Sequence, residues 1–254
     1  MKLLTLARDL QRRKAREKHR RFVAEGLRTV EALFDSPLQV VGLLVTAAFG
    51  TEPRGGALLA RASFFGLDVR EVSDSEFASA ADTDSPQGVL AVGEIPQRTL
   101  DAPPTVARLL VLDALQDPGN VGTVIRTAAA LGVTATLALP GTVDLWNAKV
   151  VRSTMGALFT QSALTCTVDM LSFMCNTHGI ACWAADIGGV AVDDVVRADL
   201  PERLALIVSN EGAGLSTDVA PLITKRVAIR MSPGVESLNV AVATGILLHA
   251  LRPI

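Results

Sequence analysis

The chain has 254 residues, a length for one or two domains, and 49% of them are hydrophobic while 20% are charged. This composition is typical of a folded globular protein and excludes a fibrous or largely disordered chain. No segment reaches the roughly 20 apolar residues that cross a bilayer, which excludes an integral membrane protein. Eight Phe, two Trp and no Tyr are too few aromatic residues to indicate a surface on which nucleic-acid bases stack.

Charge is unevenly distributed along the chain. The 24 Lys and Arg nearly balance the 26 Asp and Glu, yet residues 1–28 contain ten basic and three acidic residues. Such a cluster indicates a phosphate-rich partner such as nucleic acid. A solvated helix face is the alternative that the charge pattern leaves open.

The cysteines indicate neither a disulfide framework nor a metal site. Cys166, Cys175 and Cys182 stand at no metal-ligand spacing, and three thiols cannot all pair. We expect buried, reduced thiols, hence a cytoplasmic protein without a bound metal. The apolar run at the start of the chain is too short for a secretory signal.

A proline-rich stretch divides the chain. Residues 96–105 contain three prolines and little apolar periodicity, which predicts a linker. The expected domains are residues 1–95 and 106–254, both of ordinary domain size.

Apolar periodicity predicts alternating helices and strands in both domains. In the first domain we expect helices at 3–18, 27–34, 56–65 and 74–81, and strands at 21–25, 39–46, 68–72 and 88–94. In the second we expect strands at 108–113, 134–139, 180–186, 203–209 and 226–231, and helices at 120–131, 145–157, 169–177 and 237–251. The near-continuous apolar strands of the second domain suit a parallel sheet covered on both faces.

Three strand ends of the second domain carry unusual polar residues, and ligands of parallel α/β sheets bind at such ends. The first strand ends near Asp113 and is followed by Asn120 and Arg126 on the next helix. Asn120 is also a good helix cap, and Arg126 is also compatible with a plain surface charge.

The second junction joins an apolar strand to Asn210-Glu211-Gly212, with Gly214 next but one. Glycines allow the backbone to approach a ligand closely. The spacing matches neither a dinucleotide-binding fingerprint nor a phosphate-binding loop with its Lys.

The third junction contains a Pro233-Gly234 turn followed by Ser237, Asn239 and a long apolar helix. Ser237 is a candidate cap of that helix, whose free N–H groups could otherwise bind an anion.

Together the three junctions resemble the three motifs of the SpoU–TrmH family of RNA ribose 2′-O-methyltransferases. The resemblance rests on Asn120, Arg126, Asn210-Glu211-Gly212, Gly214 and Ser237-Leu238-Asn239-Val240. Segments 151–157, 22–26 and 85–91 are also similar to family sequences, the last two to the substrate-binding domain of members that act on ribosomal RNA.

The resemblance implies an α/β fold: a C-terminal trefoil-knot methyltransferase domain of the SPOUT type, after a smaller N-terminal α/β RNA-binding domain like ribosomal protein L30e. It implies S-adenosylmethionine as cofactor, no metal, and a homodimer. It places the cofactor on Ser209, Asn210, Gly214, Ile229, Met231 and Leu238. It assigns catalysis to Arg126, Asn120, Glu211, Ser237 and Asn239. It assigns RNA contacts to Arg12, Arg13, Lys14, Arg16, Arg20, Arg21, Arg152 and Ser153.

The family view makes Arg126 responsible for activating the ribose hydroxyl. A guanidinium stays protonated at neutral pH and is a poor base, so stabilising the alkoxide or holding an RNA phosphate is chemically easier. Asn120 would position substrate or Arg126, and Glu211 would orient Arg126 or fix its own loop.

Two residues depart from the family pattern: Ser209 stands where many relatives have Gly, and Arg230 where many have Pro. Both lie where the family holds its cofactor largely through backbone atoms, so they bear on affinity more than on activity. They keep open a non-catalytic RNA-binding or ribosome-assembly relative. A nucleotide-dependent oxidoreductase is a further alternative, and transfer RNA is the alternative substrate to ribosomal RNA.

Overall fold

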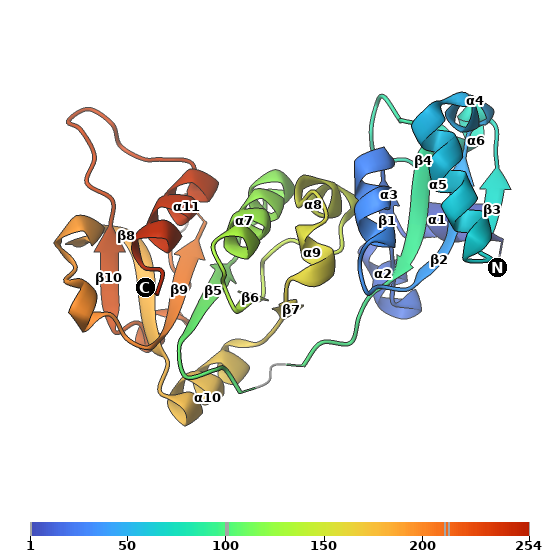
Figure 1. Ribbon diagram of the computed structural model, residues 1–254. Coiled ribbons are helices and arrows are strands. Elements are labelled where there is room, and N and C mark those ends of the chain that lie inside the picture. Colours follow the sequence, from blue (N-terminus) through green and yellow to red (C-terminus); the bar gives the residue numbers. More distant parts are fainter. Residues whose placement is uncertain (1, 100–101, 211, 213, 254) are drawn as a thin grey trace. The chain divides into compact units, whose positions relative to one another are not determined.

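The computed structural model describes residues 2–99, 102–210, 212 and 214–253. The chain divides into two compact units. The N-terminal unit comprises Met1–Gln97 with Trp146–Thr160, and the C-terminal unit comprises Arg98–Leu145 with Gln161–Ile254 (Figure 1). None of the helices in the described residues combines the length and apolar character that crossing a membrane requires.

The N-terminal unit is built on a mixed four-stranded sheet in the order β1-β4-β2-β3. Its strands are β1 (Arg21–Glu25), β2 (Val40–Val45), β3 (Asp68–Glu71) and β4 (Val89–Glu94). β4 runs antiparallel to β1 and β2, whereas β3 runs parallel to β2. Its helices are α1 (Leu3–Asp9), α2 (Arg13–His19), α3 (Leu27–Phe34), α4 (Ala47–Thr51), α5 (Pro53–Phe64), α6 (Asp74–Ala78), α8 (Ala148–Ser153) and α9 (Ala157–Thr160).

The single helix expected over residues 3–18 is two helices. The apolar spacing that packs α1 into the core stops at Leu10, and the residues after it are almost all polar. The buried guanidinium of Arg16 donates to the carbonyl oxygens of Leu10 (2.7 Å) and Gln11 (2.9 Å) just beyond the end of α1. These two bonds hold α2 against the carbonyl groups that α1 leaves unpaired.

The segment Trp146–Thr160, expected within the second domain, packs with the N-terminal unit. The ring of Phe22 lies 4.6 Å from that of Trp146 and 5.6 Å from that of Phe159, measured between centroids. These aromatic side chains are buried together. Burial of their large apolar surface explains why this segment joins the N-terminal unit although its neighbours in sequence belong to the other unit. The expected helix 145–157 is broken at Met155 and Gly156, whose φ angles are 52° and 93°. The domain boundaries inferred from the sequence stay a prediction.

The C-terminal unit contains an all-parallel six-stranded sheet in the order β10-β8-β9-β5-β6-β7. Its strands are β5 (Ala107–Asp113), β6 (Ala135–Ala138), β7 (Ala163–Thr165), β8 (Ala181–Ala191), β9 (Arg203–Ser209) and β10 (Lys225–Ala228). Its helices are α7 (Pro118–Ala130), α10 (Val168–His178) and α11 (Val240–Ala250), with single 3-10 turns at Val192–Asp194, Arg197–Asp199 and Ala220–Leu222. The parallel sheet expected from the apolar strands is therefore present, with the short strand β7 in addition.

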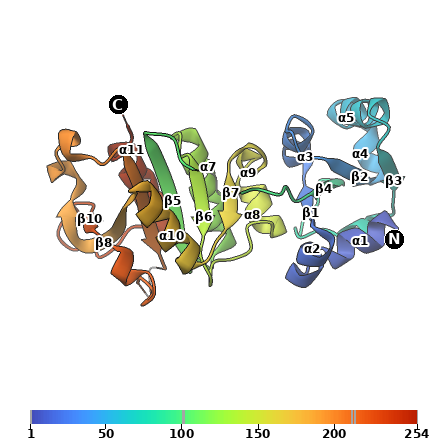
Figure 2. The same cartoon turned by 90° about the horizontal axis from the view of Figure 1, so that it is seen from below.

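Helices cover both faces of this sheet. α10 packs on one face against the alternate residues Leu109, Val111 and Ile207. α7 and α11 pack against each other on the opposite face (Figures 1 and 2). Because side chains alternate across a strand, Val208 faces the side of α11.

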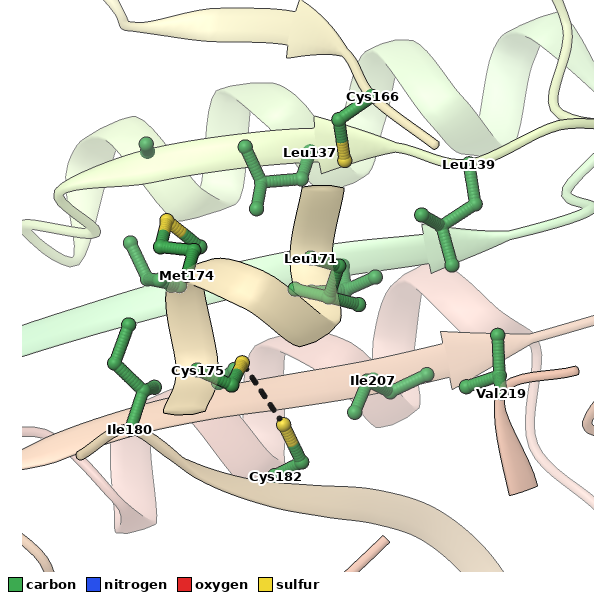
Figure 3. Packing of buried hydrophobic residues seen from close by; sticks show 14 residues of the cluster. Leu137, Leu139, Cys166, Leu171, Met174, Cys175, Ile180, Cys182, Ile207 and Val219 are labelled. Atoms are coloured by element: carbon green, nitrogen blue, oxygen red, sulfur yellow. Dashed lines mark hydrogen bonds between the residues drawn. The ribbon is translucent and has the colours of Figure 1, made fainter. Parts of the chain in front are cut away.

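The core beneath α10 contains all three cysteines as buried, free thiols, as expected (Figure 3). The Sγ atoms of Cys175 and Cys182 lie 3.3 Å apart, within hydrogen-bond distance. Burial, with a smaller contribution from Cys175, raises the pKa of Cys166 to about 11. The thiols thus fill the core as small apolar groups.

We expect Arg16→Ala to lower the free energy of unfolding by about 2 kcal/mol, because the carbonyl groups of Leu10 and Gln11 lose their hydrogen-bond donor. Arg12→Ala is the matched control, since Arg12 is exposed and its loss should change the free energy by less than about 0.5 kcal/mol. Urea denaturation of the full chain, followed by circular dichroism, measures both. Equal midpoints for the two variants would contradict a structural role for Arg16.

Candidate functional site

A pocket of about 540 Å³ opens at the carboxyl ends of β9 and β10, beside the middle of β8, in the C-terminal unit. Its walls are the ends of these strands, the loops that follow β9 and β10, and one side of α11. Pockets for small ligands span roughly 300–1,000 Å³ and lie at such strand ends. The size and position of this pocket therefore fit a small-molecule site.

All six residues that the sequence singled out for the cofactor line this one pocket. They are Ser209, Asn210, Gly214, Ile229, Met231 and Leu238. Ser237, expected in catalysis, lines it as well. The structure thus brings together segments that are some 20 residues apart in the chain, and the role of each residue stays a prediction.

The loop after β9 is closed by Asn210. Its backbone oxygen accepts from the N–H of Gly214 (2.9 Å), and its side-chain Oδ1 accepts from the N–H of Gly212 (2.8 Å). Gly214 has a φ of 69°, a left-handed conformation that glycine adopts without strain. Glu211, expected in catalysis, lies outside the described residues.

A buried carboxylate ties this loop to the neighbouring strand. Asp113 ends β5, is 1% exposed, and accepts from the N–H of Ser216 at 2.8 Å. Since β5 pairs with β9, the loop after β9 is held over the start of the segment that leads to α7. The first and second junctions are therefore structurally linked.

Asn120 is not the cap of α7. Asp117 caps this helix, its side chain accepting from the N–H of Asn120 at 2.6 Å. The amide of Asn120 is thereby left available to a partner from a distant segment. It accepts, through Oδ1, a hydrogen bond of 3.0 Å from Nδ2 of Asn239.

Asn239, rather than Ser237, caps the last helix. Its Oδ1 accepts from the N–H groups of Ala241 (2.9 Å) and Val242 (3.4 Å), so α11 begins at Val240 and not at the expected residue 237. Ser237 precedes the helix, and its exposed side chain is not consumed by capping. The side-chain amide of Asn239 thus accepts from the N–H groups of α11 through its oxygen and donates to Asn120 through its nitrogen.

Arg126 lies on α7 about 9 Å further along the helix than Asn120. Its side chain is exposed and is not part of the pocket lining. No hydrogen bond or ion pair joins it to another described residue. The guanidinium is therefore available to an anionic substrate group beside the pocket rather than within it.

The sequence did not single out the residues at the end of the expected strand 180–186, an end that lies in the middle of β8. Asp186 and Ile187 line the pocket from this strand, and Glu236 lines it from the loop before α11. Asp186 accepts from the N–H of Gly188 (2.8 Å) and pairs with Arg226. The backbone hydrogen bond, more than the ion pair, lowers the pKa of Asp186. A fourth strand end in the same sheet was the available signal.

The two departures from the family pattern take different positions. Ser209 lines the pocket. Arg230 points its guanidinium to Asp194, at 2.9 Å, and does not line it. Its charge is therefore directed at a neighbouring carboxylate.

The basic residues of the N-terminal unit divide into exposed and buried ones. Arg12, Arg13, Lys14 and Arg20 are exposed, and Arg21 is half-buried. Arg16 is only 3% exposed and donates to two backbone oxygens, which does not favour the RNA contact expected of it, and that contact stays a prediction. Its sequence neighbours gave no sign of this.

Arg152 and Ser153, on α8, are half-buried. Arg152 lies 3.4 Å from the carboxylate of Asp82 and 3.8 Å from that of buried Glu25. Its charge is partly compensated within the N-terminal unit. Among the described residues no group of three or more His, Cys, Asp or Glu is placed to hold a metal ion.

Comparison with known proteins agrees with this geometry. The model of the SpoU rRNA Methylase family matches residues 107–249, which include the whole pocket. The chain belongs to the SpoU rRNA methylase family. The MRM3-like substrate binding domain matches residues 5–91, so this SpoU-family protein has a second recognisable domain at its N-terminal end.

Its relatives are similar over most of their length. The 23S rRNA (guanosine(2553)-2′-O)-methyltransferase RlmP of Bacillus subtilis is 33% identical over 96% of this chain and 93% of its own. The 23S rRNA (adenosine(1067)-2′-O)-methyltransferase of Streptomyces laurentii is 29% identical over 82% and 78%. The AdoMet-bound rRNA methyltransferase of Sinorhizobium meliloti has a similar structure, with a TM-score of 0.83, 27% identity and coverage of 98% and 94%.

Two substitutions of Asn239 separate its two hydrogen-bonding ends. Asn239→Ala should destabilise the SpoU-family domain by about 1 kcal/mol through loss of the cap. Asn239→Asp keeps the accepting oxygen and should restore most of that loss, although it cannot donate to Asn120. Urea midpoints of the purified variants measure both effects. An Asp variant as unstable as the Ala variant would mean that capping is not what Asn239 contributes.

Proposed function

We propose that this protein transfers a methyl group from S-adenosylmethionine to a ribose 2′-hydroxyl of ribosomal RNA. The observation that carries the proposal is the Asn120–Asn239 pair beside a pocket lined by all six expected cofactor residues. The names of its relatives, which act at 2′-O positions of 23S rRNA, support the reaction and the substrate class.

The pocket fits the proposed cofactor in size and chemistry. It offers apolar side chains, Ile229 and Leu238, to flank an adenine ring, and the backbone of Ser209, Asn210 and Gly214 to bond polar groups. The similar Sinorhizobium meliloti structure is described as AdoMet-bound, which supports this choice. When bound, the cofactor supplies an electrophilic methyl group on a sulfonium sulfur.

The residues around the pocket supply positioning and charge. An alcohol is a poor nucleophile until its proton is displaced, so the hydroxyl must be oriented and its developing charge stabilised. Arg126 would stabilise the alkoxide or hold the adjacent phosphate, because a guanidinium stays protonated in proteins and is a poor base. Asn120 and Asn239 would fix the ribose, with Ser237 bonding the RNA at the pocket rim.

Glu211 would orient Arg126 or hold its own loop. Correct positioning of the two reactants alone is worth up to about 7–11 kcal/mol of the barrier. No metal is needed for such a displacement.

The N-terminal unit would grip structured RNA through its phosphates. Arg12, Arg13, Lys14 and Arg20 are exposed there, and the ion pairs of Arg12 and Arg13 with surface acids cost little to exchange for phosphates. Arg152, paired with Asp82, would exchange partners in the same way, and Arg21 and Ser153 lie at the same unit's surface. The match to a substrate-binding domain supports this role.

A homodimer would complete the assembly. Val242 and Ile246 are 52% and 40% exposed and lie one turn apart on α11, directly after the capping residue Asn239. Covering this stripe with a second copy would remove apolar surface from water next to the site. The family's trefoil knot at the loops after β9 and β10, and a cytoplasmic location, belong to the same proposal.

Arg126→Ala should lower the rate of methyl transfer by at least about 100-fold, the size expected when one group that stabilises developing charge is removed. Binding of S-adenosylmethionine should stay within about twofold, because Arg126 does not line the pocket. The assay is transfer of radiolabel from the cofactor to unmodified ribosomal and transfer RNA, with the product tested for an alkali-resistant linkage. Thr123→Ala, exposed on the same helix, is the control.

Label found only in transfer RNA would show that transfer RNA, and not ribosomal RNA, is the substrate. A wild-type protein that binds RNA but not S-adenosylmethionine, and transfers no label, would identify a non-catalytic relative. Full activity in Arg126→Ala would remove Arg126 from the mechanism and leave the reaction in place.

Ile246→Glu should convert the dimer into the 26.7 kDa monomer, because a charge cannot be buried in an apolar contact. Phe173→Glu is the control: Phe173 is 72% exposed on α10, across the sheet from α11. Light scattering after size-exclusion chromatography gives the masses. A dimer that survives Ile246→Glu but not Phe173→Glu would place the interface on α10.

A further inference from the structure

The charged side chains among the described residues that line the pocket are all acidic. Two carboxylate side chains line it, Asp186 and Glu236, and none of its described lining residues is Lys, Arg or His. The ligand therefore meets negative but no positive side-chain charge among these residues. Neither carboxylate is among the residues on which the family resemblance rests.

The two carboxylates are not equivalent. Asp186 is paired with Arg226 and accepts from the N–H of Gly188, so its charge is largely offset. The other nearby cation, Arg230, is directed to Asp194. Glu236 makes no hydrogen bond or ion pair with another described residue, and its side chain is exposed at the pocket wall. No described cation offsets its negative charge, which can act on whatever the pocket holds.

The proposed cofactor and its product differ in charge. S-adenosylmethionine carries a sulfonium, an ammonium and a carboxylate, a net charge of plus one. Loss of the methyl group leaves S-adenosylhomocysteine with a neutral thioether and a net charge of zero. A negative pocket consequently distinguishes the two by the charge that the reaction removes.

Resting on the proposed function, we propose that Glu236 is the specificity-determining residue that makes the pocket bind S-adenosylmethionine more tightly than S-adenosylhomocysteine. Its carboxylate attracts the sulfonium form and gains nothing from the thioether. Each methyl transfer then weakens binding of the spent cofactor, which favours its exchange. Glu236 acts on binding and not on the methyl transfer step itself.

The test is isothermal titration calorimetry of the full chain with each of the two compounds. Glu236→Gln should weaken S-adenosylmethionine about tenfold, the worth of one charge-assisted contact, and change S-adenosylhomocysteine by less than about twofold. Glu236→Asp keeps the charge and should retain most of the preference. A higher salt concentration should reduce the affinity ratio of S-adenosylmethionine to S-adenosylhomocysteine more in the wild type than in Glu236→Gln.

Glu202→Gln is the matched control, because Glu202 is exposed in the same unit and does not line the pocket. Equal weakening of both compounds by Glu236→Gln would overturn the inference and assign Glu236 to the ammonium that they share. An unchanged affinity ratio would overturn it as well. A wild type that binds neither compound would instead overturn the proposed function, and circular dichroism confirms that each variant is folded.

Discussion

The geometry of the site depends on the two ends of one amide. Asn239 uses its oxygen to cap α11 and its nitrogen to reach Asn120, which lies on α7. Because α11 and α7 also pack against each other, this contact fixes the loop after β10 relative to the first helix of the unit. An ionised acid at this position could only accept from the N–H groups of α11, and an alanine could bond neither partner, so the arrangement requires a side chain that accepts and donates at once.

The strand order explains why the other parts of the site meet there. β9 lies between β5 and β8, and β10 follows β8, so the carboxyl ends of all these strands share one edge of the sheet. Buried Asp113 bonds the loop after β9 at this edge. At the other edge the buried guanidinium of Arg108 donates to the carbonyl oxygens of Leu251 and Pro201, tying the end of α11 to the sheet. α11 is thus fixed at both ends, one of them beside the pocket.

Apolar runs and helical periodicity in the sequence predicted those elements whose formation depends on residues close together in the chain. The apolar runs of β5 and β9 and the periodicity of α7 were sufficient to place those elements and the strand ends where polar residues gather. Partners that are distant in the chain were not predictable. Ser237 and Asn239 are both good caps, and only the path of the loop from Gly234 decides between them. Arg16 resembled its exposed neighbours until the fold buried it.

Opposite charges on the N-terminal surface and in the cofactor pocket would separate RNA binding from cofactor binding. The N-terminal unit exposes uncommitted basic charge at Lys14 and Arg20, whereas the cofactor pocket presents the carboxylate of Glu236 and no described cation. A phosphate would be attracted by the first surface and repelled by the second, so the RNA backbone would not compete for the pocket. In the proposed mechanism Arg126, exposed on α7 outside the lining, is the positive charge that meets an incoming ribose and its phosphate. A cation placed beside the pocket rather than inside it would let one site hold a cationic cofactor and an anionic polymer together.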